Sequence, residues 1–510
     1  MVWSVVSLVF FEKNNPVFQE INIFRIKPFR TIRLLTNIST PHKMKSGSKY
    51  DFNYFILIFL FIILGFLSFI YFLFLLPSNW HRNDPLKDNL PGIKDFSNYS
   101  QKIISISLKE NNEKIINNNL GNTPLIPTYF WVRNDGRDNF KFNLVLNNKN
   151  WLTNEGIVAT IMGEEHDLSS EDKALKIFQY LSENICHFEP PFYDSSQDIS
   201  NPINLFNIFG YGWCDNFARS LAVLAEQAGL KSRVIYLNED EDRGHVVTEI
   251  FYDKAWHMFD ADRDVFYRKV NGEIASVADV FKNPTLLNER VNLKNSSLQH
   301  QKDTFFSGKI SSTISGSSLL ETLKRDKLII PLEPGEELKF YYEWKKDWFW
   351  ADFSRRPPHY TNGLLICTLN RQIIPRNFIK HIELPYPILA FNIYGKNICP
   401  KAVKILFSLD KEKWINLGSY CQNDVIKIVD VFPKGKGATI TNQYYLKFER
   451  WLSFFNLKIY TQFQVAPNSI PKLQEGKNNI ELKDIGKGKV RISFVFGPQE
   501  SSSLEIEKSQ

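Results

Sequence analysis

The stretch Gly210-Tyr-Gly-Trp-Cys-Asp-Asn-Phe-Ala-Arg219 decides how the rest of this sequence is interpreted. Two glycines and a tryptophan lead directly into a cysteine, and apolar residues follow at helical spacing from Trp213 to Leu224. This spacing predicts a helix that starts beside Cys214 and ends at Gly229, a residue suited to a C-terminal cap. The N–H groups at a helix N-terminus favour negative charge, and a cysteine placed there is favoured in its nucleophilic thiolate form.

A cysteine on a helix rich in alanine and leucine is also a common small core residue, so the thiol needs partners before it indicates catalysis. Residues 244–252 and 255–259 are predicted to form a β-hairpin, and alternation along the first strand is expected to turn His245 toward the helix. The end of a second hairpin strand lies opposite the start of the first, so Asp260 is expected near His245. Cys214, His245 and Asp260 are therefore candidates for nucleophile, base and orienting acid.

This joint pattern resembles the transglutaminase-like superfamily, whose members have a papain-like cysteine fold. The resemblance covers about residues 165–270 and rests on these segments: Gly212-Trp-Cys214 with Ala218 and Leu221, Ala228-Gly-Leu230 with Arg233, Gly244-His-Val246 with Glu249 and Tyr252, and Trp256-His-Met-Phe-Asp260. It implies that Cys214 is the nucleophile, His245 the base and Asp260 the orienting acid. The family often has Asp-Pro-Thr at the third position, whereas this chain has Asp260-Ala-Asp262, which leaves Asp262 as an alternative acid.

Substrate-binding and oxyanion positions are predicted next to the cysteine. The backbone N–H of Cys214 is one candidate oxyanion donor, and Trp213, Gly212 or a residue of the 186–210 loop is a candidate for the second. Glycines at 210 and 212 would permit a sharp turn and close approach of a substrate. The pair Cys186-His187 can approach the site, but nothing in the sequence decides whether it does.

No metal or cofactor is expected. The five cysteines form no CxxC pair, so a zinc site is not predicted. The stretch Asp260-Ala-Asp-Arg-Asp264 is similar to a calcium loop but lacks the glycine and glutamate that such a loop needs, because Val265 and Asn271 occupy those positions. His257 is interpreted as structural. Of the net charge of +7, most arises in residues 1–50, and the near-neutral remainder does not favour a nucleic-acid partner.

Residues 54–76 contain no charged side chain and would span about 34 Å as a helix, enough to cross a bilayer. We interpret them as a single-pass transmembrane helix preceded by a basic cytoplasmic segment, residues 1–53. Lysines before the helix favour a periplasmic or extracellular body. The alternatives are a buried core helix in place of the membrane span and a cytoplasmic body. Met44 is a second possible start of translation.

The predicted fold class is α+β, with a papain-like transglutaminase core, a C-terminal all-β sandwich that is jelly-roll-like, and the N-terminal transmembrane helix. Ser169 and the acids after it predict the start of a helix in the core. Beyond the membrane segment, residues 77–155 are expected to form a linker and a small β-rich region. A catalytic domain is predicted at residues 156–324. A β-sandwich region of one or two domains is predicted at residues 325–510.

The predicted function is thiol-dependent acyl chemistry in a bacterial membrane-anchored protein. The reaction would be hydrolysis of a peptide or amide, or acyl transfer to an amine, through a thioester on Cys214. The expected partners are a peptide, protein or glycoconjugate of the cell envelope, and the membrane. The alternative is a non-catalytic envelope protein that binds peptide or polysaccharide through the same fold and the β-sandwich.

Overall fold

The structure is a computed structural model of the whole chain, in two compact units, residues 1–79 and 80–510. It describes residues 11–12, 15–16, 102–109, 113–118, 127, 129–165, 167–187, 199–238, 244–291, 305, 309–323, 328–342, 362–369, 373–374, 377–397, 403–420, 425–428, 441–449, 452–470, 472–474, 476–483 and 489–496. The predicted membrane helix at 54–76 lies outside these ranges. Among the described residues, no helix has the length and apolar character needed to cross a membrane. In the first unit, β1 (Phe11–Glu12) pairs with β2 (Asn15–Pro16).

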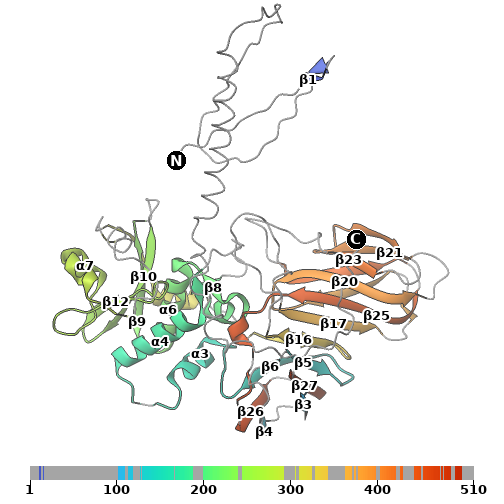
Figure 1. The fold of residues 1–510 in the computed structure, drawn as a ribbon, viewed down its shortest axis with the longest axis horizontal. Coiled ribbons are helices and arrows are strands. Elements are labelled where there is room, and N and C mark those ends of the chain that lie inside the picture. The colour runs from blue at the N-terminus through green and yellow to red at the C-terminus, as the bar shows by residue number, and fades with distance from the viewer. Residues whose placement is uncertain are drawn as a thin grey trace, which may run out of the picture. The chain divides into compact units, whose positions relative to one another are not determined.

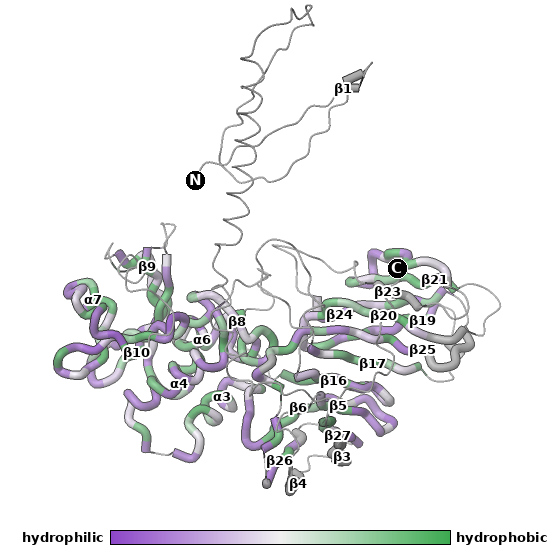
Figure 2. Tube along the Cα trace, in the orientation of Figure 1, coloured by the Kyte–Doolittle hydropathy of each residue, from purple (hydrophilic) through white to green (hydrophobic). Residues whose placement is uncertain are grey.

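Most described helices belong to the middle of the chain (Figure 1). They are α3 (Asn154–Met162), α4 (Ser170–Asn184), α5 (Pro202–Asn204), the π-helix η4 (Leu205–Phe209), α6 (Cys214–Gln227), α7 (Val277–Lys282), the 3-10 helix η5 (Pro284–Asn288), α9 (Gly316–Thr322) and the 3-10 helix η7 (Pro467–Ser469). The predicted start of α4 is confirmed, because Ser169 accepts a hydrogen bond from the Asp172 N–H. Figure 2 shows hydrophobic and hydrophilic residues alternating along α4, as expected of a helix that buries one side.

Helix α6 packs on a four-stranded antiparallel sheet with the order β11-β10-β9-β14. Its strands are β9 (Lys231–Leu237), β10 (His245–Tyr252), β11 (Ala255–Phe259) and β14 (Ile310–Ser315). The small side chains of Ala218 and Ala222 bring the helix close to Val234 and Val246. The Thr248 hydroxyl donates to the Ala218 carbonyl at 2.7 Å, which joins helix and sheet directly.

The predicted hairpin of β10 and β11 is confirmed. Its turn residues Asp253 and Lys254 have φ angles of 48° and 65°, the left-handed values that two-residue hairpin turns need. The expectation that His245 points toward the helix holds for His245 itself, whose ring lies near the Cys214 thiol at the start of α6. It does not extend to the rest of that strand face, since Val247 packs in the cluster around α7 and Glu249 accepts a hydrogen bond from the Val277 N–H. Residues one step along the strand face α6 instead, because neighbouring side chains alternate between the two faces.

The largest sheet has the strand order β23-β20-β25-β17-β16-β5-β27-β3, with β18 paired to β25 (Figure 1). Its strands are β3 (Lys102–Lys109), β5 (Tyr129–Asn134), β16 (Glu337–Tyr341), β17 (Gly363–Leu369), β18 (Ile373–Ile374), β20 (Ile388–Asn397), β23 (Val425–Ile428), β25 (Leu452–Phe463) and β27 (Lys489–Phe496). The ladders between neighbouring strands are antiparallel. Both ends of the second unit contribute strands to this sheet, since β3 and β5 pair with β27.

Two smaller four-stranded sheets accompany the large one. The first, ordered β15-β6-β26-β4, contains β4 (Glu113–Asn118), β6 (Phe140–Leu146), β15 (Ile330–Leu332) and β26 (Gly476–Lys483). The second, ordered β19-β24-β21-β22, contains β19 (Phe378–Glu383), β21 (Val403–Ser408), β22 (Ile415–Tyr420) and β24 (Gln443–Phe448). Phe391 of the large sheet stacks on Tyr444 and Phe407 of this second sheet. These contacts bury one face of each sheet, and the jelly-roll-like topology of residues 325–510 stays a prediction.

The predicted division between a small β-rich region at 77–155 and a separate C-terminal region needs correction. Strands β3 to β6 pair with strands of the C-terminal half, such as β26 and β27, in shared sheets. The ladder partners lie hundreds of residues apart, and alternation within one strand carries no information about which strand it will pair with.

Two short pairings complete the described strands. Strand β7 (Cys186–His187) pairs in parallel with β8 (Tyr211–Gly212), and β12 (Phe266–Tyr267) pairs with β13 (Arg290–Val291). The first of these pairs carries the chain into the glycine-rich stretch before Cys214.

The segment before Cys214 is held by residues that directly follow β25 of the large sheet. Buried Gln464 donates to the Ile208 carbonyl at 3.1 Å and to the Tyr211 hydroxyl at 3.2 Å. The Ala466 N–H donates to the Asn207 carbonyl at 2.9 Å. Since η4 ends just ahead of Cys214, the C-terminal strands help to position the start of α6.

We predict that Gln464→Leu destabilises the chain, because it leaves the Ile208 carbonyl without its buried amide donor. The expected cost is about 1–3 kcal/mol in the free energy of unfolding, measured as a lower urea midpoint. Gln474→Leu is the matched control, since its amide donates to the Lys477 carbonyl at an exposed position and should change stability by less than about 0.5 kcal/mol. Equal midpoints for the two variants would contradict the bracing role.

Candidate active site

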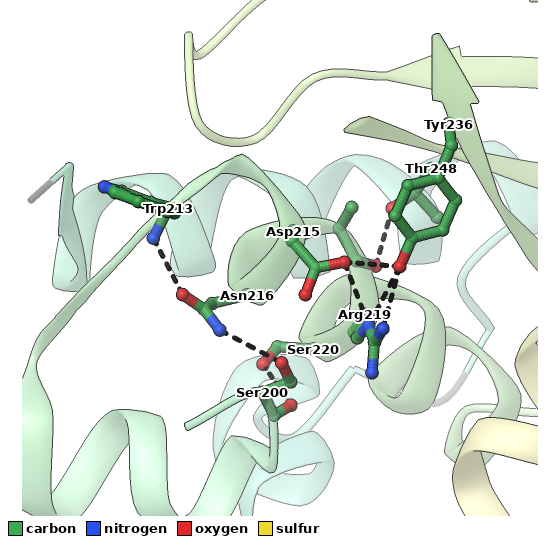
Figure 3. A network of polar contacts seen from close by, with 9 residues as sticks. Ser200, Trp213, Asp215, Asn216, Arg219, Ser220, Tyr236 and Thr248 are labelled. Carbon is green, nitrogen blue, oxygen red and sulfur yellow. Dashed lines mark hydrogen bonds and ion pairs between the residues drawn. The ribbon is translucent and has the colours of Figure 1, made fainter. Parts of the chain in front are cut away.

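Cys214 is the first residue of α6, and its side chain is half-buried against the cluster that joins the helix to the sheet. Trp213 precedes the helix in extended conformation, and its N–H donates to the Asn216 side-chain oxygen at 2.8 Å (Figure 3). The Asn216 amide in turn donates to the Ser200 hydroxyl at 3.0 Å. This capping arrangement holds the backbone on both sides of the thiol.

The two glycines before Cys214 are explained by backbone geometry and packing. Gly210 has a φ of 68° and ends η4 with a hydrogen bond from its N–H to the Leu205 carbonyl at 2.7 Å. A Cβ at Gly212 would lie 2.8 Å from the Cβ of Asn216, so only glycine lets Asn216 cap the turn. The proposed contact of Gly212 with substrate stays a prediction, and the residue itself is buried.

His245 and Asp260 form a buried pair, with 3% and 1% of their side chains exposed. The His245 Nε2 donates to the Asp260 Oδ2 at 2.7 Å. The hairpin register explains this contact. Thr248 lies opposite Phe259, so continuing the ladder places Asp260 opposite Val247, on the strand face that carries His245. Asp260 also accepts a hydrogen bond from the Arg263 N–H at 3.2 Å.

The two ionisable groups stabilise each other's charged forms. Burial lowers the pKa of His245 and the Arg263 charge lowers it further, but the charge and hydrogen bond of Asp260 outweigh both and raise it to about 9. Burial raises the pKa of Asp260, yet His245 holds the net pKa below its ordinary value. The raised pKa of His245 stabilises the fold below its ordinary value of 6.5, and that contribution is lost as pH rises through about 9.

The thiol of Cys214, a ring nitrogen of His245 and the carboxylate of Asp262 lie within 4.8 Å of one another. His245 Nε2 is bonded to Asp260, so Nδ1 is the nitrogen left to face the thiol. His245 reaches Cys214 because each residue begins its element, β10 and α6. The structure thus brings together the three side chains that the sequence pattern singled out, and it places Asp262, the alternative acid, beside the thiol and the imidazole.

Asp262 and His187 were left undecided by the sequence. Asp262, with 5% of its side chain exposed, accepts a hydrogen bond from the Nδ1 of exposed His187 at 2.5 Å. The parallel pairing of β7 with β8 places His187 beside Gly212, two residues before Cys214. No sequence pattern predicts a two-residue parallel pair. The sequence leaves the Cys186-His187 pair able to approach the site, but nothing in it indicates the strand pairing.

A polar network next to the thiol was also missed. The Arg219 Nε donates to Asp215 at 2.9 Å, and the Tyr236 hydroxyl donates to the same carboxylate oxygen (Figure 3). Arg219 further donates to the Tyr236 hydroxyl at 2.9 Å. Burial raises the pKa of Tyr236, as does Asp215, so the phenol stays neutral and able to donate. The network ties the first turn of α6 to β9.

Two other candidates have structural explanations. His257 is buried, stacks on Tyr252, and has ring nitrogens within 2.7 Å of the Ile274 carbonyl and 3.2 Å of the Tyr252 carbonyl. In the stretch from Asp260 to Asp264, Asp260 accepts a hydrogen bond from His245 and Asp262 accepts one from His187, so both carboxylates have side-chain partners within the site.

The family comparison agrees with this geometry. A family model described as the transglutaminase-like superfamily matches residues 155–261. Residues 155–261 form a transglutaminase-like domain. The match includes Cys214, His245 and Asp260, and the α+β fold class is confirmed for this part of the chain.

Two solved structures are similar to this chain. A crystal structure of a TGase is 18% identical over 21% of this chain and 31% of its own, with a TM-score of 0.18. A putative cysteine protease from Cytophaga hutchinsonii is 11% identical over 42% of this chain and 91% of its own, also with a TM-score of 0.18. The chain therefore covers about a third of the TGase. No curated protein matches this chain.

We predict that Asp260→Asn reduces the alkylation of Cys214 at mildly acidic pH. Without the carboxylate, burial and Arg263 lower the pKa of His245 unopposed, and the imidazolium that favours the thiolate is lost. The rate with iodoacetamide at about pH 6 should fall at least tenfold, a change of about 1.4 kcal/mol, and should approach the original rate near pH 10. Peptide mass spectrometry measures both rates.

Asp253→Asn is the control, because Asp253 is exposed in the turn of the same hairpin. It should leave the pH profile unchanged. A profile for Asp260→Asn that matches this control would show that the buried pair does not activate the thiol.

Proposed function

We propose that the transglutaminase-like domain catalyses thiol-dependent acyl chemistry, with Cys214 as nucleophile, His245 as base and Asp260 as orienting acid. The observation that carries the proposal is the buried His245–Asp260 hydrogen bond beside a thiol at a helix N-terminus. Each part has a chemical role, since the carboxylate orients the ring, the ring exchanges a proton, and the helix start favours the thiolate.

The first half-reaction forms a thioester. The Cys214 thiolate attacks the carbonyl carbon of an amide, a C–S bond forms, and the oxygen takes up negative charge. We propose the Cys214 backbone N–H, at the start of α6, as one donor to that oxygen. His245 then gives its Nδ1 proton to the leaving nitrogen, and the C–N bond breaks.

The second half-reaction releases the acyl group. Water or an amine attacks the thioester while His245 accepts a proton from it, and the C–S bond breaks to restore the thiolate. With water the product is a carboxylate, and with an amine it is a new amide. We propose a peptide, protein or glycoconjugate substrate, and we place hydrolysis ahead of amine transfer.

We propose further that residues 54–76 anchor the chain in a membrane and that the body lies on its outer side. Support comes from the uncharged run itself and from the lysines that precede it at positions 43, 45 and 49. The body would then meet substrates of the cell envelope.

We predict that incubating the full chain with a pool of peptides and peptide amides, followed by acid quenching, traps an acyl group on Cys214 detectable by mass spectrometry. Cys214→Ala should abolish the adduct, and Asp260→Asn should lower turnover about 10²- to 10⁴-fold. Cys367→Ala is the matched control, since Cys367 is a free thiol buried in the large sheet. Product analysis in ¹⁸O-water, with and without an added amine, separates hydrolysis from transfer.

Absence of any adduct, together with ordinary thiol reactivity at Cys214, would contradict the enzymatic proposal. It would leave a binding module as the better explanation of the domain.

We predict that protease added to spheroplasts of a bacterium expressing the full chain digests the body. The same protease should leave the body intact in unbroken cells. Replacing the three lysines before residues 54–76 with glutamate should reduce the digested fraction, since positive charge retains a flank in the cytoplasm. A body protected in spheroplasts would place it in the cytoplasm.

A further inference from the structure

Three side chains at the candidate active site could together ligate a metal ion, although the proposed catalysis needs only two of them. Cys214, His245 and Asp262 each direct one ligand atom into a space where all three atoms lie within 4.8 Å of one another. A thiolate, an imidazole and a carboxylate are the ligand types that Zn²⁺ prefers. The proposed acyl chemistry uses Cys214 and His245 but assigns nothing to Asp262.

The distances suit a small tetrahedral ion after modest closure. Zinc holds such donors at about 2.0–2.3 Å, so neighbouring donors in a tetrahedral site lie roughly 3.3–3.8 Å apart. The donor atoms would have to approach one another by at most about 1.5 Å, which side-chain rotation at half-buried Cys214 allows. The three ligands would leave a fourth position for water.

The surroundings of the donors also match a metal site. Ligating histidines usually donate their other ring nitrogen to a carboxylate, and His245 Nε2 already donates to Asp260 at 2.7 Å. Ligating carboxylates are usually held by a hydrogen bond, and Asp262 Oδ1 accepts one from His187, which leaves Oδ2 for an ion. Both partners are therefore in place around the donor set.

We propose that Cys214, His245 and Asp262 bind Zn²⁺ and that the bound ion inhibits the site. Zinc would take the Cys214 sulfur and the His245 Nδ1 together, so neither atom could act on a substrate. Zinc binds a thiolate and an unprotonated imidazole nitrogen, so binding releases to solvent any proton that these two atoms carry. Affinity should therefore rise with pH. The absence of a CxxC pair in the sequence does not bear on this site, because its ligands come from three separate elements.

The test uses the full chain and Co²⁺ as a spectroscopic probe, with Zn²⁺ as competitor. We expect Co²⁺ to produce a thiolate charge-transfer band that Zn²⁺ removes, and Zn²⁺ to protect Cys214 from iodoacetamide. Cys214→Ala should abolish the band. Asp262→Asn, which keeps an oxygen for His187, should weaken zinc affinity at least about tenfold. Asp253→Asn, in the exposed hairpin turn, should not change it.

Absence of the band, or equal zinc affinity in Asp262→Asn and the unmodified chain, would overturn the proposal. Both readouts report binding and do not need turnover. If the chain binds zinc but forms no acyl adduct, the proposed function is contradicted and the zinc site stands. If an adduct forms on the metal-free chain and zinc suppresses it, both proposals stand; if zinc binds without suppressing it, the ion is not an inhibitor.

Discussion

The hydrogen bond between His245 and Asp260 is the constraint on which the site depends. Burying two ionisable side chains costs several kcal/mol for each, and the cost is offset here by their mutual charge and by the Arg263 N–H. This requirement also specifies the hairpin. A slip of one residue between β10 and β11 would move Asp260 to the opposite face and leave His245 without its partner. Electrostatics and strand register therefore reinforce each other.

Helix α6 meets this hairpin at one end, and its orientation decides whether the thiol reaches the imidazole. Asn216 caps the start of the helix, while the Asp215–Arg219–Tyr236 network ties the same turn to β9. Thr248 bonds to the helix from the adjacent strand. With contacts on several sides, the helix can neither rotate nor slide without breaking buried hydrogen bonds, and Cys214 is held beside His245 before any substrate arrives.

The transglutaminase-like domain is not an isolated body within its unit. Gln464 and Ala466, far along the chain, bond to the segment that leads into Cys214, and the large sheet takes strands from both sides of the domain in sequence. Changes in these sheets are therefore expected to reach the thiol through η4. This bracing gives the β-rich part of the chain a structural role that does not depend on any ligand it binds.

Much of the local structure follows from the sequence alone. Helical spacing and a terminal glycine defined α6, Ser169 marked the start of α4, and alternating residues around Asp253 defined the hairpin, because each signal depends only on neighbours in the chain. The same hairpin argument placed Asp260 near His245. Tertiary structure alone decided the rest. Asp262 and His187 meet through a two-residue parallel pair, β10 turns Val247 and Glu249 toward α7, and β3 to β6 join C-terminal strands. Each of these contacts depends on which distant segments pair, and the periodicity of one segment does not predict which segment it pairs with.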